Sequence, residues 1–92
     1  HFSLNEKQIK AMNCLRDADR NGTIITSIAR DSFMYWLEHE AGMEGNDEKT
    51  KKRRRMTWLR ALNSLSDADV IVTEDAGKIV RFKDETKRED LS

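Results

Sequence analysis

The sequence lacks most of the residues on which several classes of protein depend. Only one of its 92 residues, Cys14, is a cysteine, so neither an intramolecular disulfide nor a zinc site built from several thiolates can form. A single cysteine fits a reducing compartment, and we expect the protein to be cytoplasmic. No apolar run approaches the roughly 20 residues that a membrane span requires, and no signal peptide is recognisable. We therefore expect no membrane partner.

Residues suited to catalysis are equally scarce. The two histidines, His1 and His39, are far in sequence from Cys14, so a cysteine–histidine nucleophile is not expected. The sequence has no Gly-rich phosphate-binding loop with Lys and Ser or Thr. We expect no catalytic residues, no metal site and no cofactor. The chain could still serve as a non-catalytic domain of a larger enzyme.

Length and charge limit the remaining possibilities. Ninety-two residues are enough for one domain, which we expect over residues 1–83, followed by a charged and flexible tail over residues 84–92. The 17 basic and 17 acidic residues cancel, so any binding to nucleic acid must depend on where the charge is placed. Because the sequence begins with His1 rather than Met, we interpret it as a piece of a larger parent chain.

The first half of the sequence predicts two helices separated by a short strand. "SLNE", which begins at Ser3, is typical of a capping box, and the apolar periodicity that follows predicts a helix over about 4–19 that "RNG" ends. "TIIT" is short and β-branched, so it predicts a strand. Thr26 or Ser27 can cap the next helix, in which Ile28, Phe33 and Trp36 are expected to share a buried face and which ends at Gly42.

The second half predicts a long helix and a β-hairpin. Asn46 or Asp47 can cap a helix over residues 48–66, whose buried stripe is expected to contain Trp58, Leu59, Leu62 and Leu65. After "SDAD" the pattern changes to the alternation of strands, in which Val70, Val72, Val80 and Phe82 point to one side. "TEDAGK" separates the two strands, and Gly77 can adopt a positive φ in this turn. The predicted fold class is α+β.

The helix over 48–66 begins with an unusual accumulation of positive charge. Six of the seven residues from Lys49 to Arg55 are cations, and no acid occurs between Lys49 and Arg60. Each cation at a helix N-terminus opposes the helix dipole by roughly 0.3–1 kcal/mol, and the cations repel one another. Folding alone would favour acids here, so the pattern indicates a negatively charged partner. The alternative is a solvated helix start paired with nearby acids.

The order helix, strand, helix, helix, hairpin resembles that of a winged helix-turn-helix domain over residues 3–83. More specifically, "EKTKKRRRMTWLRALNSLSDADVIV" is similar to the C-terminal winged-helix domain of plasmid and phage replication ATPases, which are associated with helicase or primase activity. Asp69 stands where such domains usually have Gly, and the loop before the third helix is longer than usual. The resemblance implies a three-helix core, a hairpin wing, and a part in DNA replication.

We therefore predict a DNA-binding module that uses the helix over 48–66 as its recognition helix and prefers double-stranded DNA. Arg53, Thr57 and Arg60 share the outward face and are expected to enter the groove. The acidic wing tip, Glu74 and Asp75, would repel phosphates. Two alternatives remain, a protein-interaction domain that docks an acidic partner and a transcriptional regulator of the same fold. The candidate nucleic-acid-binding residues are Lys49, Lys51, Lys52, Arg53, Arg54, Arg55, Thr57, Arg60, Lys78 and Arg81.

Overall fold

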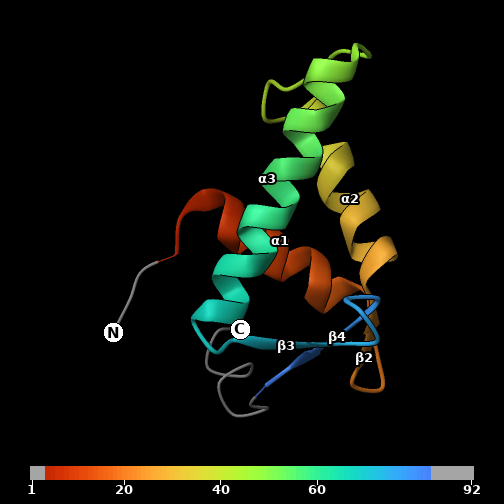
Figure 1. Ribbon diagram of the computed structural model, residues 1–92, viewed down its shortest axis with the longest axis vertical. Coiled ribbons are helices and arrows are strands. Elements are labelled where there is room, and N and C mark those ends of the chain that lie inside the picture. The colour runs from red at the N-terminus through yellow and green to blue at the C-terminus, as the bar shows by residue number, and fades with distance from the viewer. Residues whose placement is uncertain (1–3, 84–92) are drawn as a thin grey trace.

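The structure, a computed structural model, describes residues 4–83 and contains three helices and a small antiparallel sheet (Figure 1). The predicted α+β class is confirmed. Ser3 and the predicted tail over 84–92 lie outside the described residues. No helix within residues 4–83 is long and apolar enough to cross a membrane. The elements are α1 (Glu6–Asp17), β1 (Asp19–Arg20), β2 (Thr23–Ile25), α2 (Thr26–His39), α3 (Glu48–Asp67), β3 (Ile71–Glu74) and β4 (Ile79–Phe82).

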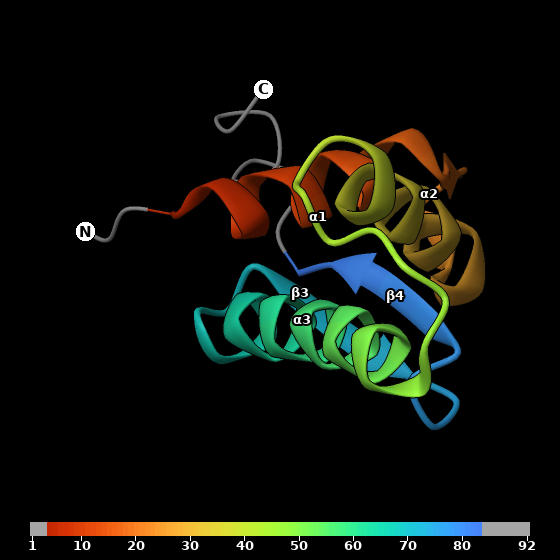
Figure 2. The same cartoon turned by 90° about the horizontal axis from the view of Figure 1, so that it is seen from above.

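The sheet joins the strand before α2 to the C-terminal hairpin. Its strand order is β1-β2-β4-β3, and Ile24 of β2 pairs with Val80 of β4. The sheet closes one end of the helical part, and the connection between α2 and α3 lies at the opposite end (Figure 1). Seen from above, α3 lies over the β3–β4 hairpin, while α1 and α2 lie together to one side (Figure 2).

The segment "RNG" forms a hairpin turn rather than the end of the first helix. Helix α1 already ends at Asp17, and β1 and β2 pair directly across the turn. Asn21 and Gly22 both have positive φ values, 59° and 87°. Two consecutive positive φ angles are what a two-residue hairpin turn requires, and Asn-Gly adopts them most readily. We interpreted the same Asn-Gly pair in the sequence as the end of the first helix and therefore did not predict β1.

All three helices and the sheet contribute to one hydrophobic core. The ring of Trp58 on α3 packs against Phe33 on α2, with centroids 5.3 Å apart. Trp36, predicted on the same buried face, is only partly buried and also contacts Phe33. The largest fully buried side chains come from every layer of the structure: Phe33, Leu15, Ile24, Leu37, Leu65, Ile71 and Val80.

Three predicted core positions are wrong. Leu59 is 46% exposed and Ile28 is 51% exposed, because each lies at the edge of its helix's apolar stripe, beyond the reach of the neighbouring element. In the hairpin Val70 and Val80 are buried as predicted, but Ile71 is also buried and Val72 is exposed, opposite to the prediction at these two positions. This difference follows directly after the turn that ends α3, in which Asp69 has φ 62° and the Val70 N–H donates to the Leu65 carbonyl, so regular strand alternation begins only after Val70.

The helix caps also differ in part from the predictions. The capping box of α1 consists of Asn5 and Gln8, whose side-chain oxygens accept each other's backbone N–H at 2.8 and 2.9 Å. Of the two predicted caps for α3, Asn46 and Asp47, the structure uses Asp47, whose carboxylate accepts the Thr50 N–H. Helix α2 has no side-chain cap. Instead, the Thr26 hydroxyl donates to the Gly77 carbonyl at 2.6 Å, which fastens the start of α2 to the hairpin loop.

Candidate nucleic-acid interface

The basic start of α3 is held in place by the connection that precedes it. The guanidinium of Arg54 donates through Nη1 to the carbonyl oxygens of Met43 and Gly45, at 2.7 and 2.9 Å. Arg54 is only 8% exposed. The sequence placed Arg54 among the candidate nucleic-acid-binding residues, but its guanidinium is engaged within the fold. The remaining cations of the cluster stay on the surface.

The acid that caps α3 stays ionised beside these cations. Hydrogen bonds from the hydroxyl and then from the backbone N–H of Thr50 lower the pKa of the Asp47 carboxyl. A carboxylate at a helix N-terminus interacts favourably with the helix dipole. Asp47 thus offsets part of the cost that the following lysines and arginines impose on this end of α3.

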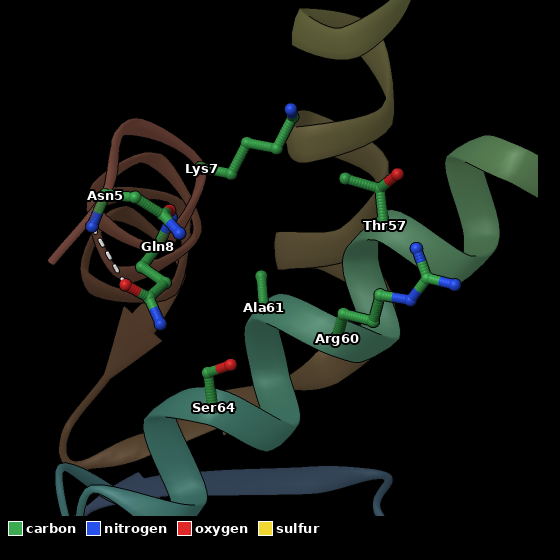
Figure 3. Close-up of a pocket in the computed structure, with 7 residues that line it drawn as sticks. All are labelled: Asn5, Lys7, Gln8, Thr57, Arg60, Ala61 and Ser64. Atoms are coloured by element: carbon green, nitrogen blue, oxygen red, sulfur yellow. Dashed lines mark hydrogen bonds between the residues drawn. The ribbon is translucent and has the colours of Figure 1, made fainter.

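Two adjoining hollows run along α3 on the side that faces α1. One lies against Asn5 and Gln8 of α1 and Ala61 and Ser64 of α3 (Figure 3), and the other lies nearer the start of α3. Both are lined by Lys7, Thr57 and Arg60. Because the two hollows share these residues, we treat them as one surface feature and name it the α1–α3 channel.

The α1–α3 channel collects cations from two helices and contains no acid in its lining. All five of its cations are exposed, and no aromatic ring lines it. The Thr57 hydroxyl donates to the Arg53 carbonyl at 2.8 Å, so its oxygen can only accept a further bond. A surface of this kind can bind an extended anion through several separate charges. The cations are Lys7, Lys49, Lys52, Arg53 and Arg60.

The other candidate residues lie elsewhere. Lys51 and Arg55 line the opposite flank of α3, beside Arg30 and Met34 of α2. Lys78 is exposed in the hairpin loop. The structure therefore brings Lys49, Lys52, Arg53, Thr57 and Arg60 together and separates them from Lys51, Arg55, Lys78 and Arg81.

Arg81 forms contacts within the sheet. Its Nε donates to the Glu74 carboxylate at 2.8 Å, while its Nη1 donates to the Gly22 carbonyl and the Thr23 hydroxyl at 3.2 and 3.1 Å. These contacts join β4 to Glu74 at the end of β3 and to the β1–β2 hairpin at Gly22 and Thr23. Of the two acids at the tip of the β3–β4 hairpin, Glu74 is therefore paired with Arg81, and this ion pair offsets its charge.

Lys7 was missed by sequence reasoning because nothing in the local pattern distinguishes it from other surface lysines. Its position as the second residue of α1, two residues after the Asn5 cap, indicates only that it lies near the helix start. The packing of α1 against α3 then places it beside Thr57 and Arg60. No spacing rule along the chain connects residues 50 positions apart.

The described part of the chain contains no group of three or more His, Cys, Asp or Glu side chains placed to hold a metal ion. The chemistry of the channel is that of hydrogen-bond donors and fixed positive charges. Comparison with known protein families, with curated proteins and with solved structures finds no significant match to this chain.

Proposed function

We propose that this chain is a winged-helix module that binds nucleic acid, double-stranded DNA foremost, with α3 as its recognition helix. The observation that carries the proposal is the α1–α3 channel, which has five cations and no carboxylate in its lining. A net charge of zero makes this segregation informative, because the acids are elsewhere. The pairing of β2 with the β3–β4 hairpin is compatible with a winged-helix layout.

In this proposal α3 enters the major groove, which is wide enough to admit a helix. Arg53 and Arg60 are exposed along the channel and can each bind guanine through two hydrogen bonds. Lys49 and Lys52 neutralise phosphates, and the release of counterions from DNA makes the affinity strongly salt-dependent. The module has no chemical step of its own, since its groups bind anions rather than transfer protons or electrons.

Fluorescence anisotropy with a random duplex at two salt concentrations tests the proposal. The two phosphate-binding lysines of α3 imply a log–log slope of about −1.8, so affinity falls about 12-fold between about 50 and about 200 mM salt. The double variant Lys49→Ala/Lys52→Ala should remove most of this salt dependence while its circular dichroism spectrum stays unchanged. No binding of duplex at the lower salt concentration would refute the proposal.

Single variants separate base contacts from phosphate contacts. Arg53→Ala and Arg60→Ala should each change the ranking of a set of duplex sequences, whereas Lys52→Ala should weaken all of them by the same factor. Equal, sequence-independent effects from all three variants would show that α3 does not read bases.

The wider role that we propose is in the replication of a plasmid or phage. It follows from the resemblance of residues 48–72 to the C-terminal domain of replication ATPases, and the module would place a larger cytoplasmic parent chain on DNA. A transcriptional regulator would use the same surface of α3. Binding of origin DNA in preference to promoter DNA from the same replicon would separate the two roles.

A second candidate function is the docking of an acidic protein partner on the opposite flank of α3. There a groove between α2, α3 and the hairpin loop is lined by Met34, Leu59 and Leu62, with Arg30 and Arg55 beside them. Leu59 is 46% exposed, so an apolar residue of a partner could cover it while carboxylates pair with the arginines. Leu59→Glu should abolish binding of an amphipathic leucine–glutamate peptide and leave duplex binding intact. If the native chain does not bind the peptide, this candidate fails.

A further inference from the structure

We propose that α1 takes part in nucleic-acid binding, with the α1–α3 channel holding the phosphate backbone of one strand and Lys7 acting as a phosphate-binding residue. The inference rests on the proposed function but adds a residue and an element to it. Lys7 lies on α1 and is therefore not part of the recognition helix α3.

Lys7 lies where α1 borders the channel. It lines both hollows of the channel together with Thr57 and Arg60, and it is exposed. Figure 3 shows Lys7 on α1 and Arg60 on α3 as two cations that border the same hollow. An anion held there would meet positive charge from both helices. No carboxylate lines the channel, so the attraction of the anion to these cations is not opposed.

The first hollow of the channel also contains neutral hydrogen-bond donors. The capping box of α1 engages the side-chain oxygens of both Asn5 and Gln8, so the NH₂ groups of both amides can donate into the first hollow, which both residues line. Ser64 adds a half-buried hydroxyl on the α3 side, and the small side chain of Ala61 leaves space between the helices. Phosphate oxygens are acceptors, and this lining offers them donors.

The shape and lining of the channel favour a backbone over bases. No aromatic side chain lines it, so it offers no platform on which bases could stack. Lys49 and Arg60 are eleven residues apart in the sequence, which corresponds to about 16 Å along a helix. Over that length a DNA strand advances by about five phosphates along the duplex axis. A chain of phosphates therefore suits the channel better than a single small anion.

The test compares Lys7→Ala with Lys10→Ala in duplex binding. Both variants remove one lysine from α1, but the Lys10 ammonium lies 5.9 Å from the centroid of a Trp36 ring and Lys10 does not line the channel. Three phosphate contacts in the native chain, from Lys7, Lys49 and Lys52, imply a salt slope of about −2.7 and a loss of about 40-fold in affinity between about 50 and about 200 mM salt. Lys7→Ala should reduce the slope to about −1.8 and the loss to about 12-fold.

The outcomes distinguish this inference from the proposed function. If Lys10→Ala keeps the native slope and Lys7→Ala weakens two unrelated duplexes by the same factor, Lys7 binds phosphate. If Lys7→Ala keeps the native slope, or if both lysine variants lower it equally, the inference is overturned while duplex binding by α3 stands. If the native chain binds no duplex at all, the proposed function itself fails. Thermal unfolding of both variants should match that of the native chain.

Discussion

Arg54 should be essential for stability and not for binding, although it lies among cations expected to contact DNA. Arg54→Met keeps most of the aliphatic stem of this nearly buried residue and removes the guanidinium. Hydrogen bonds from a charged donor contribute about 1.5–3 kcal/mol each. Arg54 makes two from one nitrogen, and water can partly replace them because Met43 and Gly45 are half-buried. We therefore expect a loss of about 2 kcal/mol, or about 8–16 °C in Tm for a domain of this size.

Urea and thermal denaturation followed by circular dichroism measure this loss. The matched control is Arg53→Met, which removes an adjacent and exposed guanidinium and should change the free energy of unfolding by less than about 0.5 kcal/mol. In duplex binding the order should reverse, with Arg53→Met the more damaging at temperatures where both variants are folded. Equal stabilities of the two variants would refute the structural role given to Arg54.

Three further predictions concern the core, the α3 cap and the sheet. Leu62→Ala should lower stability by about 2–5 kcal/mol, whereas Leu59→Ala should cost less than about 1 kcal/mol; chemical denaturation compares the two, and equal losses would place Leu59 in the core. Because the pKa of Asp47 is lowered below its ordinary value of 3.8, its contribution to stability is complete above that value and is lost as the pH falls through the lowered one. The Tm difference between the native chain and Asp47→Ala should therefore be largest near neutral pH and shrink below about pH 4; a constant difference would contradict this. Arg81→Ala should lower stability by no more than about 1 kcal/mol, since its ion pair with Glu74 is exposed, and it should weaken duplex binding less than the loss of an α3 cation does; a larger binding defect would return Arg81 to the interface.

Several features of the fold follow from local patterns that were present in the sequence. The long apolar periodicity of α3 and the acid at Asp47 predicted that helix and its cap correctly. The β-hairpin was predicted from alternation and from Gly77. The Asn21–Gly22 pair is the strongest short-range signal for a hairpin turn, so β1 could have been predicted from the sequence. It was missed because a Gly after a helical segment is also a helix stop.

Other features could not be read from local patterns. Arg54 looks the same as Arg53 and Arg55 in sequence, and only the path of the connection before α3 brings two carbonyl oxygens to its guanidinium. The exposed state of Leu59 likewise depends on how far the hairpin loop reaches over α3. Burial of a side chain at the edge of an apolar stripe is set by the neighbouring element and not by the stripe.

The sequence by itself determined the identity of the elements and the concentration of positive charge on α3, because helical periodicity, strand alternation and charge runs are local properties. Only the tertiary structure decided which cations act together. Packing of α1 against α3 brings Lys7 to Arg60 and turns a charged helix into a two-sided channel, while burial removes Arg54 from the surface. The physical reason is that an electrostatic site depends on distances between side chains in space, and these distances are fixed by contacts between residues far apart in the chain.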